Sequence, residues 1–517
     1  MKKIVKYMLG TVLFPLALSS CTDKFEEYNT NPNLPSKLDS EALIAPLIDC
    51  LASPEENPCQ RNNTFWACFG GYVTVTNTWS WGDTNYYTYN IDDERNRWSA
   101  DYYFNSLYKN YFSIARMTEG RGPVYALAQL FRVSIMQYVV NMQGPLPYTQ
   151  VKDGLFSVAY DDEKTAYTQM FADLDAAIES LTQAAGAATG GFNPLRDYDR
   201  VYEGDYTKWV KFANSLKLRM AIRISAVEPE LAHQKALEAV QHPIGVMESA
   251  GDTAWDKLNG RYKNGFHTVQ GWGEIAANAS ITSYMSGYND PRMPIYFTPA
   301  YDGSYTGVRS GIRGIKPNQY CTGEQMASKF NVTETTPMLI FSASEVAFLR
   351  AEAALLGWAD VCSSAEQYYN KGIEISFLER GVEGSASEYY NNSSLKPADF
   401  MDLKNGTYNY NIDHKLTIKW DNGASAEEKL ERLIIQKWIA NFPLGAEAWN
   451  DYRRTGYPQI FPAVDNLSNQ GVTQERGQRR LRFSLTEYES NSENVKAAAA
   501  MIGGDRENID LWWAKKN

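Results

Sequence analysis

The chain has 517 residues, of which 44% are hydrophobic, so it is long enough to bury a large core or several domains. Its formal net charge is −11 and no stripe of Lys or Arg runs along it, which argues against nucleic acid and anionic lipid surfaces as partners. Aromatic residues make up 13% of the chain, with 34 Tyr and 13 Trp, and these two side chains suit half-exposed binding surfaces as well as cores.

The chain begins with the features of a secretory signal. Lysines precede a mostly apolar run of about a dozen residues, which is too short to cross a bilayer because crossing needs about 20. The run ends in Leu18-Ser19-Ser20-Cys21, which resembles the lipobox of bacterial lipoproteins, where the cysteine is acylated and becomes the new N-terminus. We therefore predict a signal peptide over 1–20 and a lipid anchor on Cys21. An ordinary cleaved signal followed by a chance cysteine is the alternative.

An acidic, proline-containing segment, "TDKFEEYNTNPNLPSK", follows the predicted anchor. Its composition is typical of a solvated tether, so we predict that 21–38 links the anchor to a folded body over 39–517. Acidic residues directly after an acylated cysteine also resemble the signal that exports some lipoproteins to the outer face of the outer membrane.

The stretch "NTWSWGDTNYYTYN", residues 77–90, has an unusual composition. It contains Trp79, Trp81, Tyr86 and Tyr87 among mostly polar neighbours. A buried strand would usually carry Val, Ile or Leu between its aromatic residues, and this stretch has none. Composition alone leaves two interpretations open, namely packing into a core or a surface on which a ligand stacks.

Three cysteines lie close together near this stretch, at Cys50, Cys59 and Cys68. If the predicted anchor uses one of the six cysteines of the chain, an odd number remains. The spacing allows one disulfide among the three in an oxidising compartment, and it equally allows buried thiols.

Amphipathic helices are predicted over most of the remaining chain. In "TAYTQMFADLDAAIESL" the apolar residues repeat every three or four positions and form one stripe. Ser342 and Glu345 match a capping box in front of another apolar helix. Because the helices occur in pairs, we predict a mainly α fold of stacked helical hairpins of the tetratricopeptide type. The pairs are 98–119 with 123–141, 163–184 with 206–226, 343–357 with 363–380, and 427–442 with 445–453.

Two long segments, at about 242–340 and 455–490, show little periodicity. Long loops inside a compact protein are usually functional or disordered. These segments are rich in Trp, Tyr and Phe, which argues against disorder and favours a binding role.

The sequence offers little evidence for catalysis. Its four His do not stand at metal-ligand spacing, and HExxH, CxxC, Walker and GxSxG motifs are absent. Clusters of acidic residues occur, but with 61 Asp and Glu in the chain such clustering does not indicate a glycosidase pair. We therefore predict no enzyme activity, no cofactor and no metal.

The segment "GAEAWNDYRRTGYP" carries several charges at one helix end. Glu447, Asp451, Arg453 and Arg454 are placed to form ion pairs there, and the following Gly and Pro are expected to end the helix. Adjacent Arg residues can instead hold an anionic ligand. We favour the structural interpretation.

Several segments together resemble the SusD/RagB family of outer-membrane lipoproteins, and in particular its SusD-like branch. "FSASEVAFLRAEAALLGW" and "IIQKWIANFPLGAEAWNDYRRTGYP" are the most specific, whereas Ser484 stands where the family usually has proline. With the lipobox, the matches spread over nearly the whole chain after the signal. The matching segments are 143–150, 199–223, 290–292, 341–358, 434–458 and 479–491.

The resemblance implies helical hairpins with long ligand-binding loops packed against them, and it implies no catalysis. Members of the family act at the cell surface as lids on a SusC-type TonB-dependent transporter, where they capture a ligand, often an oligosaccharide. We therefore expect a lipid-anchored outer-membrane protein that faces the exterior, with a glycan ligand and such a transporter as its partners. A peptide ligand, as on the RagB side of the family, is the main alternative, and a surface glycan hydrolase is the less favoured one.

The ligand-binding residues are predicted on physical grounds, because 77–90 lies outside the matching segments. Sugar rings present apolar C–H faces that stack on Trp and Tyr, while polar side chains bind their hydroxyl groups. We expect one exposed aromatic platform, with packing of the loops onto the body as the alternative for each residue. The candidates are Trp79, Trp81, Tyr86, Tyr87, Trp272, Tyr296, Tyr301, Tyr305 and Arg309.

Overall fold

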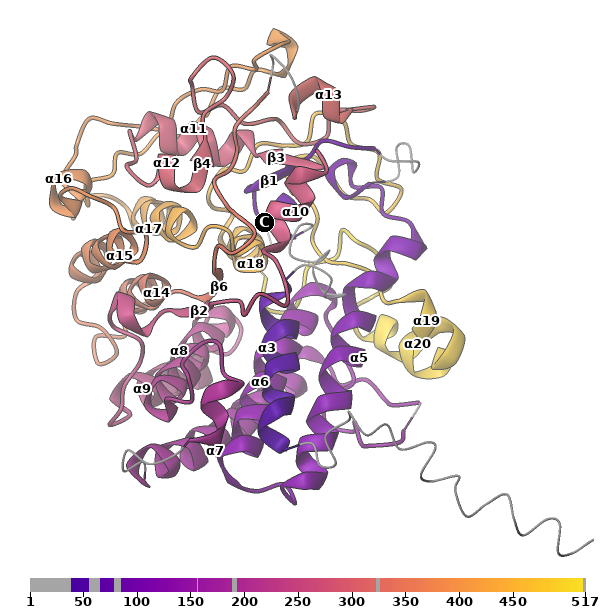
Figure 1. Ribbon diagram of the computed structural model, residues 1–517. Helices are drawn as coiled ribbons and strands as arrows, with labels where there is room; N and C mark the ends of the chain where they lie inside the picture. The colour runs from indigo at the N-terminus through magenta and orange to yellow at the C-terminus, as the bar shows by residue number, and fades with distance from the viewer. Residues whose placement is uncertain are drawn as a thin grey trace, which may run out of the picture.

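The computed structural model describes residues 39–54, 66–78, 85–155, 157–187, 193–321 and 326–514. Helices form the body, and the strands are short, so the predicted mainly α fold is confirmed (Figure 1). The predicted signal peptide, the anchor at Cys21 and the tether lie outside the described residues.

The first half of the chain forms a stack of helices, seen in the lower half of Figure 1. They are α3 (Ile44–Ala52), α5 (Asp93–Met117), α6 (Gly122–Gln143), α7 (Glu163–Ala187), α8 (Tyr206–Ile224) and α9 (Pro229–Gln241). α5 packs on α6, α6 on α7, α7 on α8 and α8 on α9, while α3 covers α5 and α6. Two predicted pairs are found here, and α9 is a helix that the sequence did not lead us to predict.

The second half contributes the other two predicted pairs and a C-terminal helical pair. The helices are α14 (Ala343–Leu355), α15 (Ala365–Glu379), α16 (Ala386–Tyr390), α17 (Ala426–Ala440), α18 (Gly445–Thr455), α19 (Leu485–Ser490) and α20 (Ser492–Met501). α14 packs on α15, on α17 and on α8, and it therefore joins the two halves of the molecule.

Polar side chains cap the starts of α8 and α14. Asp205 accepts a hydrogen bond from the backbone N–H of Lys208 at 3.1 Å and caps α8. Ser342 caps α14, but the predicted capping box is only half formed. The Glu345 carboxylate instead binds the Arg219 guanidinium at 2.7 and 2.8 Å, because a buried opposite charge is a stronger partner than a backbone N–H.

The predicted loop region at 242–340 holds only short elements, most of which lie above the helical stack in Figure 1. They are α10 (Gly265–Gly271), α11 (Ala279–Gly287), α12 (Met293–Tyr296), α13 (Pro317–Tyr320), β2 (Ala254–Asp256), β3 (Ile275–Ala277), β4 (Phe297–Thr298), β5 (Lys329–Phe330) and β6 (Met338–Phe341). The antiparallel pairs are β2 with β6, β4 with β5, and β3 with β1 (Val73–Val75). The β1–β3 pair places the chain just before 77–90 beside the later loops.

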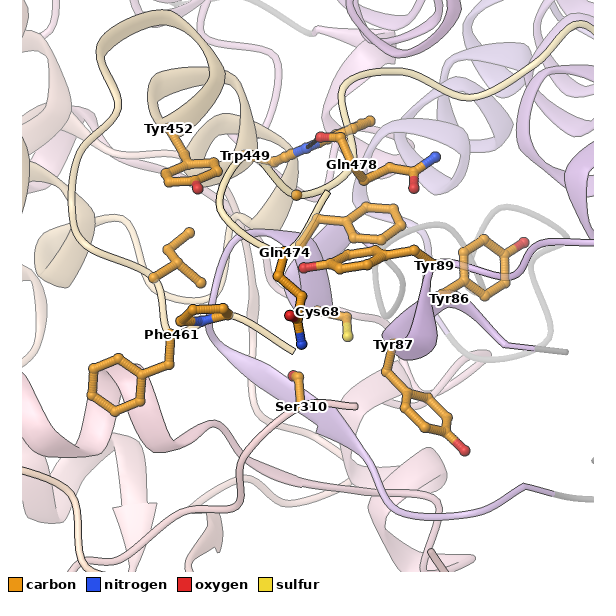
Figure 2. Close-up of a pocket in the computed structure, with 14 residues that line it drawn as sticks. Cys68, Tyr86, Tyr87, Tyr89, Ser310, Trp449, Tyr452, Phe461, Gln474 and Gln478 are labelled. Atoms are coloured by element: carbon orange, nitrogen blue, oxygen red, sulfur yellow. Dashed lines mark hydrogen bonds between the residues drawn. The ribbon is translucent and has the colours of Figure 1, made fainter. Parts of the chain in front are cut away.

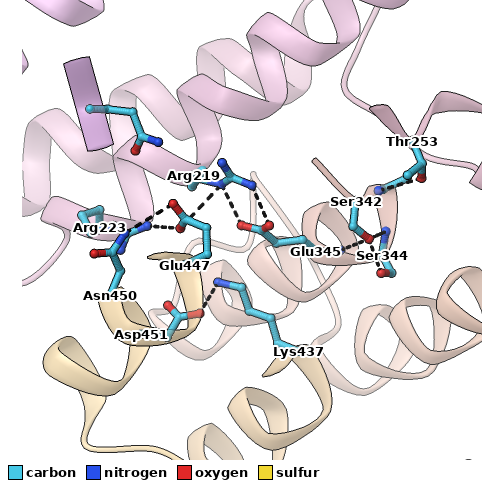
Figure 3. A network of polar contacts seen from close by, with 12 residues as sticks. Arg219, Arg223, Thr253, Ser342, Ser344, Glu345, Lys437, Glu447, Asn450 and Asp451 are labelled. Atoms are coloured by element: carbon cyan, nitrogen blue, oxygen red, sulfur yellow. Dashed lines mark hydrogen bonds and ion pairs between the residues drawn. The ribbon is translucent and has the colours of Figure 1, made fainter. Parts of the chain in front are cut away.

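A network of buried charges lies where α8, α14 and α18 meet (Figure 3). Arg219 and Arg223 of α8 bind Glu345 of α14 and Glu447 of α18, and all four side chains are at most 3% exposed. Opposite charges that are buried together hold the helices in one arrangement, because separating them would leave a charge without compensation.

The charged residues around the end of α18 extend this network. Asp451 binds Lys437 at 2.9 Å and Arg454 at 3.1 Å, and Arg454 also pairs with Glu352. Burial alone would raise the pKa of Asp451, but the two cations outweigh it and hold this pKa below its ordinary value. Arg453 donates to two backbone carbonyls. These contacts support the structural interpretation of the motif over an anion site.

Cys68 is buried and carries a free thiol, and Cys50 is also buried. Cys59 lies outside the described residues, so a disulfide among the three cysteines stays a prediction. Among the helices in the described ranges, none is both long enough and apolar enough to cross a bilayer.

Candidate functional site

The second half of the aromatic stretch 77–90 belongs to the core. Tyr86 and Tyr87 begin the 3-10 helix η2 (Tyr86–Thr88), and they are only 1% and 2% exposed. The expectation that both rings belong to an exposed platform is therefore wrong. Asn85 and Asn90 form a backbone bridge that closes a turn around the two residues. The rings are buried because Tyr86 and Tyr87 pack into hydrophobic clusters with residues from other parts of the chain.

Figure 2 shows the small cavity that these tyrosines line. Tyr89 joins them from the same turn, and Trp449 and Phe461 from the second half of the chain complete the wall. The cavity has a volume of about 30 Å³, which is enough for two or so water molecules. A sugar ring does not fit into it, so this cavity is a packing feature.

Tyr296 and Arg309 are likewise buried, at 2% and 7% exposure. The Tyr296 ring stacks on Phe442 with centroids 4.6 Å apart. Arg309 donates to the carbonyl oxygens of Tyr408 at 3.3 Å and Pro462 at 2.6 Å, and so ties together two late segments of the chain. Neither side chain lies on the exposed platform that the sequence led us to expect.

Trp272 and Tyr301 remain as exposed candidates, at 61% and 49%, and Tyr305 is half-buried. Trp272 directly follows α10, whose start is capped by the Asn264 side chain. The next residue, Gly273, has φ +75°, a conformation that favours glycine. This turn projects the indole ring away from the body while its backbone stays hydrogen-bonded.

The backbone beside Trp272 is tied to the early aromatic stretch. The Thr76 hydroxyl donates to the Gly273 carbonyl at 3.0 Å, and the Thr76 N–H donates to the Glu274 carbonyl at 2.9 Å. Thr76 precedes Trp79 by three residues in the sequence. Trp79 and Trp81 themselves lie outside the described residues.

Polar side chains border the same region through α13. Pro317 of α13 lies so close to Gly273 that a Cβ there would approach it to 3.1 Å. The Tyr320 hydroxyl donates to Asp402 at 3.1 Å, and the Lys404 ammonium lies 4.8 Å from the Tyr320 ring centre. Burial, followed by the Asp402 charge, raises the pKa of Tyr320 above its ordinary value, so this hydroxyl stays a donor.

These polar residues of 401–408 were not predicted as part of a site. The segment "MDLKNGTY" lacks aromatic clustering and periodicity, so it has the composition of an ordinary loop. Long-range contacts bring it next to α13, namely those of Asp402 and Lys404 with Tyr320, which lies 82 residues before Asp402. No local signal in the sequence reports such a contact.

Several acidic side chains line a hollow of about 440 Å³. This hollow is relevant to the hydrolase alternative, because glycoside hydrolysis needs a pair of carboxylates. Glu427 accepts from Tyr457, Glu428 completes a capping box with Ser425, and Glu431 binds His414 at 2.5 Å. Each of these carboxylates thus has a structural partner. Within the described ranges, no group of His, Cys, Asp or Glu is arranged to hold a metal ion.

A helical body with irregular loops and surface-exposed aromatic residues defines a class of binding proteins built on helical repeats. The family model described as SusD-like, the SusD and RagB outer-membrane lipoproteins, matches residues 37–514. The chain therefore belongs to this family.

Solved structures agree with the assignment. A SusD-like protein from Bacteroides thetaiotaomicron is 44% identical with a TM-score of 0.88, and the match covers 93% of this chain and 99% of that one. A chitin-binding SusD homologue from Flavobacterium johnsoniae is 33% identical with a TM-score of 0.86, covering 92% and 98%. A SusD homologue from Bacteroides uniformis is 36% identical with a TM-score of 0.84, covering 93% and 100%. No curated protein matches the sequence.

Proposed function

We propose that this protein binds an oligosaccharide on the face that carries Trp272 and delivers it, as a lid, to a TonB-dependent transporter without catalysing a reaction. The observation that carries the proposal is the exposure of Trp272. Of the tryptophans whose burial is described, it alone is exposed, at 61%, although its backbone is fixed on both sides. Because the backbone that carries the ring is already fixed, less entropy is lost when a sugar ring stacks on the indole than on a mobile loop.

Two further observations support a glycan. Exposed polar side chains of 401–408 border the region and can bind hydroxyl groups, with Lys404 and Asn405 both exposed. In addition, the homologue from Flavobacterium johnsoniae is described as chitin-binding, and it shares 33% of its residues with this chain. A peptide ligand would be held mainly by its backbone and would depend less on an exposed flat ring.

The experiment is a binding measurement on the purified protein after a glycan array has found a ligand, with N-acetylglucosamine oligomers included. We expect Trp272→Ala to lower the affinity tenfold or more, since loss of one stacking ring costs about 1–3 kcal/mol. The melting temperature should change little, because removal of an exposed ring leaves no cavity. The same result is expected for Trp79→Ala and Trp81→Ala.

A matched control is Leu378→Ala, which removes a 72% exposed apolar side chain from α15. This variant should bind the glycan like the wild type. Unchanged binding by Trp272→Ala would contradict the proposed site, and an array on which only peptides bind would contradict the proposed ligand.

A further inference from the structure

A second surface groove, with a volume of about 480 Å³, lies between β2 and β6 on one side and α12 and β5 on the other. This volume is typical of small-molecule sites. Trp272 does not line the groove, and its walls are mostly aromatic and aliphatic. The side chains that matter here are Trp255, Phe266, Tyr296, Phe330, Arg380 and Phe442.

Two cations line this groove, Lys257, which pairs with Glu203, and Arg380, which has no carboxylate partner among the described residues. Arg380 is the one that packs against the aromatic wall. Its guanidinium carbon lies 5.0 Å from the ring centre of Trp255 and 4.9 Å from that of Tyr296, so the two rings hold the group in place. Its Nη2 donates to the carbonyl oxygens of Ala440 and Phe442. Its Nε is buried and has no hydrogen-bond partner in the described part of the chain. The salt bridges among the described residues do not include Arg380, so no carboxylate of the fold occupies its remaining donors.

The Tyr296 hydroxyl is a second donor without a partner. The side chain is 2% exposed, and its oxygen has no hydrogen-bond partner among the described residues. Buried polar groups in native proteins are nearly always hydrogen-bonded, and exceptions need an explanation. Here two exceptions, Arg380 Nε and the Tyr296 hydroxyl, belong to side chains in contact on the wall of one groove.

Glu379 also lines the groove but does not neutralise this site directly. Its carboxylate accepts hydrogen bonds from Thr253, from the Ser342 hydroxyl, and from the N–H and hydroxyl of Ser344. The two serines stand at the start of α14, where the helix dipole favours a negative charge. The charge of Glu379 is therefore stabilised by hydrogen bonds within the fold, whereas the charge of Arg380 has no carboxylate partner among the described residues.

We propose that this groove binds an aromatic monocarboxylate, independently of the glycan. The carboxylate binds Nη1 of Arg380, which the fold leaves available, in a charge-assisted hydrogen bond beside the Tyr296 ring. The aromatic ring lies against Trp255, Phe266 and Phe330, whose faces and edges favour ring contacts. Charge complementarity selects an anion, and the aromatic walls select a flat apolar body.

The probes are 3-phenylpropionate and its neutral amide, 3-phenylpropionamide, measured by calorimetry on the purified full chain. We expect the acid to bind at least tenfold more tightly than the amide. Arg380→Gln should abolish this difference and Arg380→Lys should reduce it, because lysine keeps the charge but lacks the planar group that lies against Trp255 and Tyr296. Tyr296→Phe should weaken binding of the acid several-fold. It removes only the hydroxyl and keeps the aromatic ring, so it tests the site even if the Arg380 variants do not fold.

The control is Trp272→Ala, which should bind 3-phenylpropionate like the wild type. This variant separates the two sites, because it is expected to lose the glycan and keep the acid. Equal affinities for acid and amide, or no binding of the acid by the wild type, would overturn the proposal. Retention of the full acid preference by both Tyr296→Phe and the Arg380 variants would overturn it as well.

Discussion

At the scale of single residues, Glu163 links folding to pH. It begins α7, is 4% exposed, and accepts hydrogen bonds from the backbone N–H of Trp512 at 3.1 Å to both carboxylate oxygens. Burial raises its pKa from 4.5 to about 7, although the hydrogen bond from Trp512 acts in the opposite direction. The folded protein therefore binds more protons at this residue than the unfolded chain does.

The sign of the pH effect follows from this pKa. Between pH 4.5 and about 7 the free energy of unfolding contributed by Glu163 falls as pH rises, because the folded state must lose a proton that the unfolded state has already lost. The contribution lost amounts to about 3 kcal/mol. Glu163→Gln mimics the protonated form and should lack this loss. Denaturant unfolding at pH 5 and pH 8 measures it, with the exposed Glu493→Gln as the control. Parallel pH profiles for wild type and Glu163→Gln would contradict the assignment.

At the scale of elements, the buried charges described above join α8, α14 and α18. Glu345→Gln keeps the shape of the side chain but leaves Arg219 without its bidentate partner, so we expect a loss of about 3–5 kcal/mol in the free energy of unfolding. Glu203→Gln is the matched control, since Glu203 pairs with Lys257 at the surface, where both are more than half exposed.

The control should cost much less, because solvent and salt screen an exposed pair. Denaturation with guanidinium chloride at pH 7 compares the two variants. Similar small losses in both would show that the Arg219–Glu345 pair adds nothing beyond a surface pair. That result would remove the argument that buried charges hold the halves of the molecule together.

At the scale of the whole molecule, the predicted anchor determines where the protein resides. Cys21→Ala should release it from membranes, because a lipid-modified cysteine would otherwise supply the acyl chains that hold a soluble body to a bilayer. Fractionation of cells with a salt wash, followed by detection of the protein, makes the comparison. A variant that stays with the outer membrane after the wash would contradict the anchor at Cys21.

The lid role makes a second prediction at this scale. A stable complex with a transporter buries more than about 1,000 Å², so mild detergent extraction at native expression should recover a large TonB-dependent transporter with this protein. Recovery of the protein alone in several detergents would count against the lid.

The sequence by itself determined the four predicted helix pairs, although it did not reveal α9. Local signals specify these features, because apolar residues at every third or fourth position and side chains such as Asp205 and Ser342 at helix starts act within one or two turns. The half-formed capping box at Glu345 marks the limit of that reasoning. The Glu345 carboxylate binds Arg219, which lies 126 residues away in the sequence, instead of the helix start.

Only the tertiary structure decided which aromatic residues are exposed. Tyr86, Tyr296 and Trp272 all stand in nonperiodic segments rich in aromatic residues, yet two are buried and one is 61% exposed. Burial in such segments depends on what packs against them from elsewhere in the chain, such as Phe442 against Tyr296. Arg309 is a further example. Its place in a loop led us to predict contact with a ligand, but its guanidinium binds the carbonyls of Tyr408 and Pro462 and joins two backbone segments. Helical periodicity is a local property, whereas the exposure of a loop side chain is set by long-range contacts.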